Sequence, residues 1–221
     1  MDLPIALFPV AGQWLMVAIT ALGLYQTLRR APWGRLRAAT QLNLLLGFAV
    51  ALTLLWSMKA GVMPGLNLHL LGAMAATLAL GSWLAVVALG LALGGITLNG
   101  GVAWSDWPLN FVLMVLAPVA FAHGFLRAVE RWLPAHFFIF VFVVSFAGAA
   151  VTVMLQGVLA SSALVLAGAY SAGFLLSEYL PFFLLLGFSE AWISGAVITL
   201  LVVYRPEWVA AFDDRRYLLD K

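Results

Sequence analysis

A lone histidine in a glycine- and proline-rich segment is the residue of this sequence best suited to bind a metal ion. His69 follows Met63-Pro64-Gly65 and precedes Gly72, between two long apolar stretches. A neutral imidazole is a common ligand of divalent transition metals. At a turn beside a membrane helix such a ring can stay open to water, whereas inside the helix it would need a polar partner. We therefore interpret His69 as the centre of a site at a membrane boundary.

Four more groups are candidates for the same site: the α-amine of Met1, the carboxylates of Asp2 and Asp106, and the amide of Asn99. An amine, a carboxylate and an imidazole together suit a borderline divalent metal, with Met63 as a soft additional donor. This donor set does not identify the metal, because imidazole binds nickel, copper, cobalt, zinc and iron. Structural roles stay open as well: His69 can bond a loop carbonyl, and Asp106 can cap a helix that starts near Pro108. Asp2 can be a solvated terminus.

The composition is that of a membrane protein. Hydrophobic residues make up 65% of the 221 residues and charged residues 9%, with a mean hydropathy of +1.07. In soluble domains roughly a quarter of the residues are charged. Uncharged runs at 3–28, 38–58, 60–105 and 132–177 each reach the roughly 20 residues that span a bilayer. The sequence predicts an all-α, polytopic helical membrane protein in which residues 1–221 form a single transmembrane domain.

The absence of cysteine narrows the chemistry. It excludes disulfides, thiolate ligands and a thiol nucleophile, so a metal must be held by nitrogen, oxygen or methionine sulfur. The first apolar run starts directly after Met1-Asp2, without a basic leader or a clear cleavage site, and we expect it to be retained as a span. The net charge is +2, and the basic residues lie in short loops. This pattern predicts membrane topology rather than nucleic-acid binding.

Arginine clusters predict which loops face the cytoplasm. One cluster separates the first two runs and, by the positive-inside rule, places the N-terminus outside: Arg29, Arg30, Arg35 and Arg37. The second span, 38–58, then leads to an outer segment at 59–69. We split 69–98 into two short or tilted spans near Gly81, because it is too long for one ordinary helix and rich in glycine. Residues 99–107 then also lie outside.

The rest of the chain follows the same rule. The span 108–127 ends in a basic loop that we place in the cytoplasm, and 134–156 returns outward. The basic tail after Tyr204 needs one further crossing, which 182–204 supplies. We therefore expect 157–181 to be an external or re-entrant helix.

This topology gives about seven spans with a glycine-rich external loop. The N-terminus is then outside and the C-terminus cytoplasmic, and the lipid bilayer surrounds the helices. The alternative of eight spans would leave the basic tail outside, against the charge rule. In the seven-span topology every member of the candidate site falls on the outer side of the membrane: Met1, Asp2, His69, Asn99 and Asp106.

The order of these segments resembles that of a known transporter family. It combines S-M-K-A-G-V-M-P-G-L-N-L-H-L-L-G at 57–72, L-G-G-I-T-L-N-G-G at 93–101 and an N-x-x-x-x-V-x-A-P stretch at 110–118. Over about residues 1–204 the chain resembles the M-type permease, the membrane substrate-binding component of cobalt and nickel energy-coupling factor transporters. The resemblance implies uptake of a divalent transition metal, nickel or cobalt, across the bacterial inner membrane.

The resemblance also implies ligands and partners. Members of the family hold the metal with the terminal amine, a histidine at position two and the loop histidine. Met1 and His69 match two of these positions, whereas Asp2 stands where the family has histidine. The histidine that precedes paired glycines in the family is also missing, with Leu93 in its region. Energy would come from a separate transmembrane coupling subunit and cytoplasmic ATPases, because this chain has no P-loop of the form G-x-x-x-x-G-K-[ST].

Two other interpretations use different residues. His123 and His136 flank the second basic loop and could lie at similar depth on adjacent spans. Such a pair would suit haem or a metal in a membrane redox or assembly factor, or a metal exit site. Glu190, inside the last span, is costly unless protonated or paired, and Ser189 lies in a G-x-S triplet. These two residues would be the centre of a third alternative, an intramembrane enzyme, although G-x-S triplets are common in apolar helices. The metal-uptake interpretation assigns no catalysis to the chain.

Overall fold

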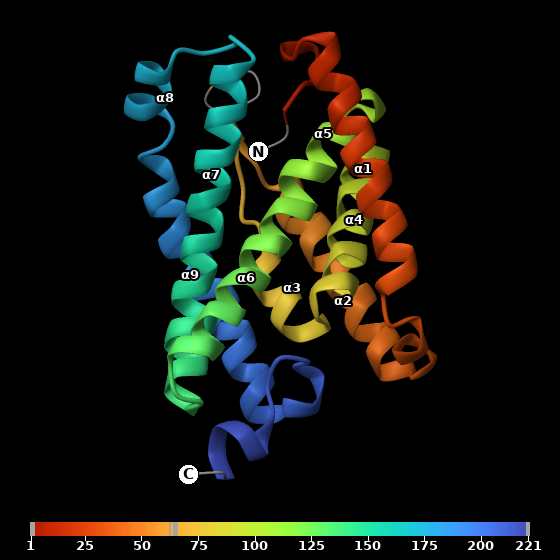
Figure 1. Cartoon of the computed structure of the whole chain (residues 1–221), viewed down its shortest axis with the longest axis vertical. Helices are drawn as coiled ribbons and strands as arrows, with labels where there is room; N and C mark the ends of the chain where they lie inside the picture. Colours follow the sequence, from red (N-terminus) through yellow and green to blue (C-terminus); the bar gives the residue numbers. More distant parts are fainter. Residues whose placement is uncertain (1–2, 62, 64–65, 220–221) are drawn as a thin grey trace.

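The structure, a computed structural model, describes residues 3–61, 63 and 66–219, and most of them belong to helices (Figure 1). The α-helices have the following bounds: α1 (Val10–Arg30), α2 (Ala39–Ser57), α3 (Ala73–Leu80), α4 (Ser82–Leu98), α5 (Trp107–Asn110), α6 (Ala117–Trp132), α7 (Gly148–Leu166), α8 (Ala172–Glu178) and α9 (Phe182–Tyr204). Two π-helical segments lead into α6 and α7: η4 (Phe111–Leu116) and η5 (Ile139–Ala147). Shorter helical turns complete the chain: η1 (Ile5–Leu7), η2 (Trp33–Arg37), η3 (Trp104–Asp106), η6 (Pro206–Trp208) and η7 (Arg215–Leu219).

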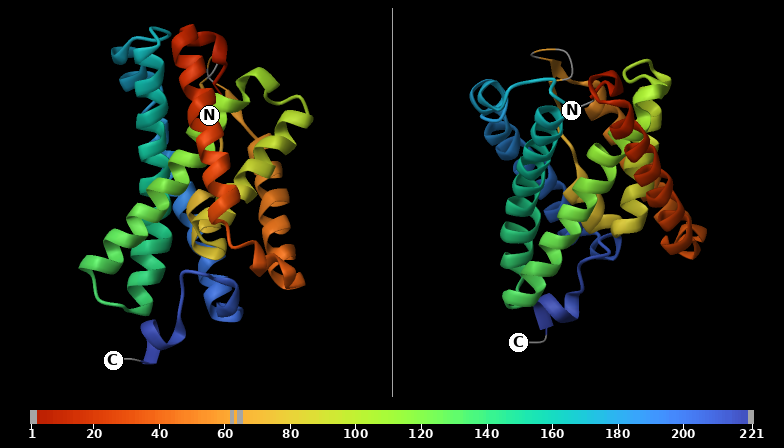
Figure 2. Two further views of the ribbon diagram at one scale, coloured as in Figure 1. Left: turned by 45° about the vertical axis from the view of Figure 1, so that its right-hand side comes forward. Right: turned by 45° about the horizontal axis from the view of Figure 1, so that its top comes forward.

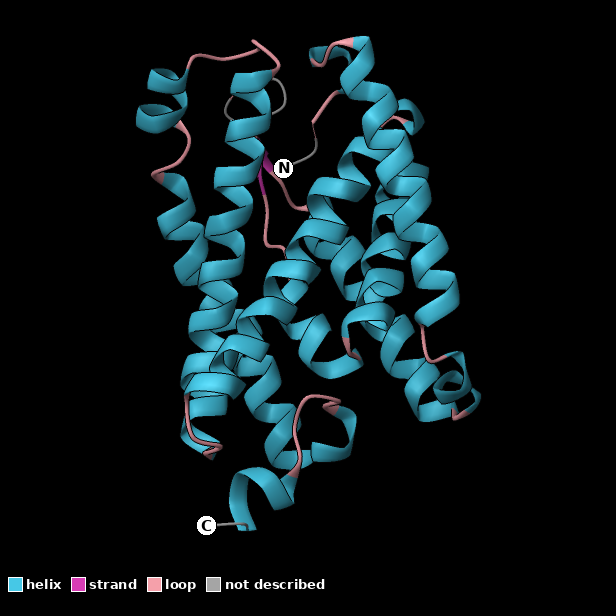
Figure 3. Cartoon of the chain, in the orientation of Figure 1, coloured by secondary structure: helices cyan, strands magenta, loops and turns pink. Residues whose placement is uncertain are grey.

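A small antiparallel ladder, drawn in magenta in Figure 3, lies between α2 and α3. β1 (Ala60–Gly61) pairs with β2 (Asn67–Leu68), with Ala60 opposite Leu68. The ladder folds this connection into a loop, and after β2 the chain turns into the bundle. The short segment 69–72, which contains His69, therefore lies between the ladder and the start of α3.

The connections between helices gather at two opposite ends of the molecule, which we call the N-terminal end and the C-terminal end. The β ladder, the turn between α4 and η3, and the connection between α7 and α8 lie toward the N-terminal end (Figure 1, Figure 2). The α1–α2 connection, the α3–α4 turn and the tail after α9 lie toward the other end. The ladder that precedes His69 and the turn that carries Asn99 and Asp106 thus share one end, as the topology expected from the sequence requires.

Four helices in the described ranges are long and apolar enough to cross a membrane: Ala39–Ser57, Trp104–Trp132, Ile139–Leu166 and Phe182–Tyr204. The break expected near Gly81 is confirmed, since α3 ends at Leu80 and α4 begins at Ser82, with Gly81 at a φ of 80°. Both helices are shorter than a usual span, α3 with 8 residues and α4 with 17. The count of seven spans stays a prediction.

The expected boundary at residue 157 is wrong. The helix that starts at Ile139 continues without a break to Leu166, so residues 157–166 extend it rather than start a re-entrant segment. Gly157 lies inside this helix, where a Cβ would collide with the ring of Phe183 on α9. The glycine therefore permits close packing of two helices. Within the expected segment 157–181, the part after Leu166 contains one short separate helix, α8.

The centre of the bundle is α3, in which every residue is buried. Its sequence of alanines, leucines, one threonine and one methionine lets neighbouring helices approach closely, as small residues do in membrane bundles. α3 contacts α4, α6, α7 and α9. Because α3 begins directly after Gly72, the segment that carries His69 leads straight into the most buried helix of the molecule.

Candidate functional site

His69 lies inside the protein. Its side chain is 3% exposed, and its ring packs against Trp56 of α2 with 5.5 Å between the ring centroids and 45° between the planes. This corrects the expectation of an imidazole held open to water. The segment after β2 turns into the bundle, and the large ring of Trp56, itself 1% exposed, covers the histidine.

One nitrogen of the His69 ring has a defined role. Nδ1 lies 2.9 Å from the carbonyl oxygen of Leu70. A carbonyl can only accept a hydrogen bond, so Nδ1 carries the proton and donates. In this tautomer Nε2 keeps the lone pair, which is the arrangement typical of metal-binding histidines whose other nitrogen donates to a backbone carbonyl.

The backbone after His69 is fixed from two helices. Trp56 Nε1 of α2 donates to the Leu71 carbonyl at 3.2 Å. Glu190 of α9 accepts from the Leu71 N–H and the Gly72 N–H, both at 2.7 Å. Gly72 has a φ of 68°, and a Cβ there would collide with Leu52. Glycine is thus required both for the backbone conformation and for the space at this position.

The N-terminal segment is held by one buried amide, that of Asn110 at the end of α5. Its Oδ1 accepts from the Leu3 N–H at 2.8 Å, and its Nδ2 donates to the Leu3 carbonyl at 3.0 Å. Nδ2 also donates to the Asp106 carbonyl at 3.0 Å. Asn110 is 0% exposed and Leu3 is 1% exposed. The side chain of Asn110 pairs with both backbone groups of Leu3, much as a neighbouring strand would.

Asp106 adds a second hold on the same segment. Its Oδ1 accepts from the Ile5 N–H at 3.0 Å and from the Ser105 hydroxyl at 3.2 Å. The position of Asp106 is that of an N-cap for α5, but its side chain makes no capping hydrogen bond. Asp106 therefore ties η3 to the N-terminal segment instead of closing the helix start.

The N-terminal segment and the segment around His69 both contribute side chains to one large apolar cluster. Leu3 belongs to the same set of contacting buried side chains as Trp56, Leu66 and Leu71. Met1 and Asp2, two of the predicted ligands, lie outside the described residues. Residue 3, which follows them directly, is buried in this cluster, to which Trp56 also belongs.

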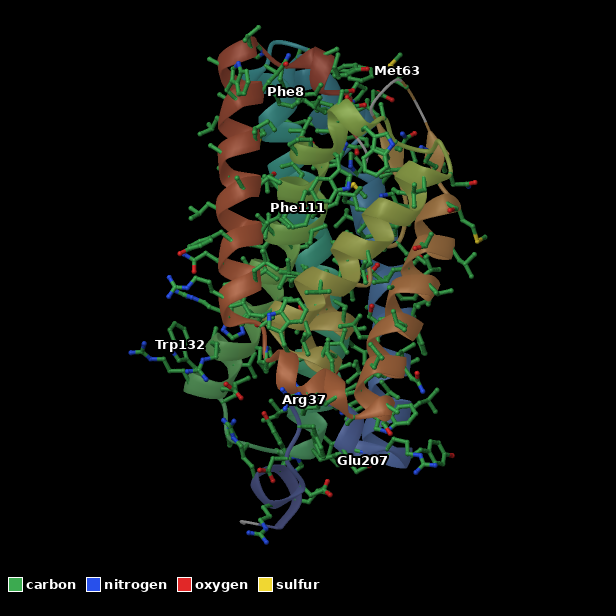
Figure 4. The ribbon with its side chains drawn as sticks, turned by 90° about the vertical axis from the view of Figure 1, so that its right-hand side faces the viewer. Phe8, Arg37, Met63, Phe111, Trp132 and Glu207 are labelled. Atoms are coloured by element: carbon green, nitrogen blue, oxygen red, sulfur yellow. The ribbon has the colours of Figure 1, made fainter. Side chains whose placement is uncertain are left out.

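The remaining predicted donors lie nearer the surface. Asn99 is exposed at the C-terminal end of α4, where its N–H donates to the Gly95 carbonyl. Met63, 47% exposed, lies at the N-terminal end of the molecule, as does Phe8, and far from Glu207 at the opposite end (Figure 4). In the described part of the chain, no group of three or more His, Asp or Glu residues is placed to hold a metal ion.

The residues of the two alternative interpretations have local partners. His123 Nδ1 lies 2.9 Å from Ser82 Oγ, whereas His136 Nδ1 accepts from the Phe138 N–H at 3.2 Å. These two histidines therefore use one ring nitrogen each on separate neighbours. Ser189 is exposed on α9 and donates to the Leu185 carbonyl within its own helix at 3.1 Å.

Asn110 and Trp56 were not predicted from the sequence as site-forming residues. A signal for Asn110 was available, since an amide in an apolar span is costly unless it has partners. Trp56 lies near the end of its predicted span, where tryptophans usually anchor in the membrane interface. Nothing in the sequence alone distinguishes it from the other tryptophans.

The fold and site define a helical membrane protein with a buried histidine next to an anchored N-terminal segment. The family model described as the cobalt uptake substrate-specific transmembrane region matches residues 2–208. The chain therefore belongs to this family, which confirms the resemblance stated from the sequence. It is a multi-pass membrane transport component. Comparison with curated proteins and with solved structures gave no match.

Proposed function

We propose that the chain captures cobalt on the outer side of the membrane and holds it with the Met1 amine, the Asp2 carboxylate and His69 Nε2. The observation that carries this proposal is the state of the His69 ring. Its Nδ1 donates to a carbonyl, so Nε2 is the nitrogen with a lone pair for a metal. Family membership supports cobalt as the substrate.

The anchoring of the N-terminal segment supports the first two ligands. Asn110 pairs with both backbone groups of Leu3, and Asp106 pairs with the Ile5 N–H. Leu3 shares an apolar cluster with Trp56, the residue that covers His69. Met1 precedes Leu3 by two residues, and each residue of a backbone spans at most about 3.6 Å. The chain length between Leu3 and the Met1 amine is therefore short.

The donor set affects the choice of metal. Asp2 supplies an oxygen where the resemblance implies a histidine nitrogen, which broadens the range of acceptable divalent metals rather than narrowing it. We propose cobalt first and nickel second. Asn99 and Asp106 remain outer candidates for a contact with the incoming hydrated ion, and the bond of Asp106 to Ile5 makes its structural role the main one.

The chain acts in this proposal as a substrate-binding component without catalysis of its own. A separate transmembrane coupling subunit and cytoplasmic ATPases supply the energy, and the chain sits in the inner membrane with its N-terminus outside and its C-terminus in the cytoplasm. The arginines of η2 and of the α6 end lie at the C-terminal end of the molecule, which supports this orientation by the positive-inside rule.

The test is a cobalt titration of the purified chain, in which binding is measured by calorimetry. We expect stoichiometric cobalt in the wild type and a loss of binding in His69→Ala. A variant with residues added before Met1 should also lose binding, because the α-amine is displaced. His123→Ala is the matched control and should bind like the wild type. Full binding by His69→Ala would overturn the proposal.

A further inference from the structure

Glu190 makes an unusual set of contacts for a residue in the middle of an apolar helix. It is 2% exposed, and its carboxylate accepts from the Leu71 N–H, the Gly72 N–H and the Ser194 hydroxyl at 2.7, 2.7 and 2.9 Å. Among the described residues its hydrogen-bond donors are all neutral. A buried carboxylate is expensive, and replacement by apolar side chains is often tolerated where no role requires the charge. The hydrogen bonds of Glu190 to the backbone next to His69 indicate a role in the site of that histidine.

The bond to Leu71 continues to His69 through a single peptide group. The N–H of Leu71 and the carbonyl of Leu70 belong to the same planar amide. Glu190 Oε2 accepts from the nitrogen side of this amide at 2.7 Å, and His69 Nδ1 donates to its oxygen side at 2.9 Å. Hydrogen bonds in such a chain polarise one another, so a carboxylate at one end strengthens the acceptor at the other.

We propose that Glu190 is a positioning residue for the metal site, which acts on His69 through the peptide group between Leu70 and Leu71. This inference rests on the proposed function. The carboxylate makes the Leu70 carbonyl a better acceptor, which holds the Nδ1 proton in place and makes Nε2 a stronger donor to a metal. Metal-binding histidines commonly pair with a carboxylate directly. Here one amide is inserted between the two groups.

Further hydrogen bonds fix the backbone that follows this amide. Trp56 Nε1 donates to the Leu71 carbonyl at 3.2 Å, and the second carboxylate oxygen of Glu190 holds the Gly72 N–H. These two bonds hold the next peptide group, between Leu71 and Gly72, against α2 and α9. The Leu70–Leu71 amide cannot rotate without breaking its own bond to Glu190. Ser194, one turn after Glu190 on α9, fixes the carboxylate in turn.

The first measurement needs no variant. Nitrogen-15 spectra of the metal-free wild type should show His69 protonated at Nδ1 and unprotonated at Nε2. The chain has three histidines, so the His69 signals are those that remain in a His123→Asn, His136→Asn double variant. Protonation at Nε2 instead would overturn the proposal. Because no metal is present, this result is independent of whether the chain binds cobalt.

The second measurement compares two carboxylate-to-amide variants. Glu190→Gln should mix the two ring tautomers of His69 and weaken cobalt binding by about 10- to 100-fold, the usual effect of losing an outer partner of a metal ligand. Glu178→Gln, at an exposed position on α8, makes the same charge change and should leave both readouts unchanged. A folded Glu190→Gln with wild-type ring signals and wild-type cobalt affinity would overturn the proposal. If Glu190→Gln does not fold, the wild-type ring state decides.

Discussion

Replacing Asn110 by leucine tests whether the anchored N-terminal segment is part of the metal site. The side chains are similar in size, so the substitution removes three hydrogen bonds with little change in volume. Two of them join the Asn110 side chain to Leu3, one to its N–H at 2.8 Å and one to its carbonyl at 3.0 Å. Asn110 and Leu3 are both buried. In the variant these two backbone groups lose their partner.

The expected magnitude follows from these two groups. A buried polar group left without a hydrogen bond costs about 1 to 3 kcal/mol, so docking of the N-terminal segment becomes less favourable by about 2 to 6 kcal/mol. If cobalt binds only when this segment is docked, the apparent affinity falls with the docked fraction. At the lower end of the range the dissociation constant rises by up to roughly 30-fold.

The assay is cobalt calorimetry with the purified Asn110→Leu variant, together with thermal unfolding. Asn43→Leu is the matched control. Asn43 is an exposed residue of α2, and its substitution makes the same chemical change away from the site. We expect weaker cobalt binding in Asn110→Leu alone. Equal cobalt affinity in both variants would refute the link between Leu3 anchoring and metal binding.

Further substitutions test the loop and the second anchor. Gly72→Ala should lower both the melting temperature and the cobalt affinity, because a left-handed backbone costs a non-glycine residue about 1 to 2 kcal/mol and the new Cβ would collide with Leu52. Gly100→Ala is its control, since Gly100 has a φ of 76° but open space around it; similar losses in both would show that the collision is unimportant. Asp106→Ala should weaken cobalt binding by a few-fold through loss of the bond to Ile5, whereas Asp106→Asn keeps an acceptor oxygen and should bind nearly normally in calorimetry. A large loss in Asp106→Asn would instead identify Asp106 as a metal ligand.

The sequence was sufficient for the fold class and for much of the chain path. Long uncharged runs predict membrane helices, and a glycine that must adopt a positive φ marks the break at Gly81. The boundary expected at residue 157 was wrong, because charge counting fixes the number of crossings but not where a helix ends, and Gly157 makes room for Phe183 inside a continuous helix. Tertiary packing decides where such a helix ends.

The candidate site could be predicted only in part. The chemistry of imidazole was enough to select His69, and the predicted topology put Asp106 on the same side of the membrane as the N-terminus. The burial of His69 by Trp56 and the pairing of Asn110 with Leu3 depend on contacts between residues far apart in the chain. Glu190 was recognised as costly, but its partners are backbone N–H groups, which leave no trace in a sequence.

The most direct test of the account is anomalous diffraction at the cobalt absorption edge from crystals of the cobalt-loaded full-length chain. We predict one strong peak at bonding distance from His69 Nε2, on the side of the ring away from Nδ1 and the Leu70 carbonyl, next to the N-terminal residues that precede Leu3. A peak at His123 or His136 with none at His69 would contradict the account.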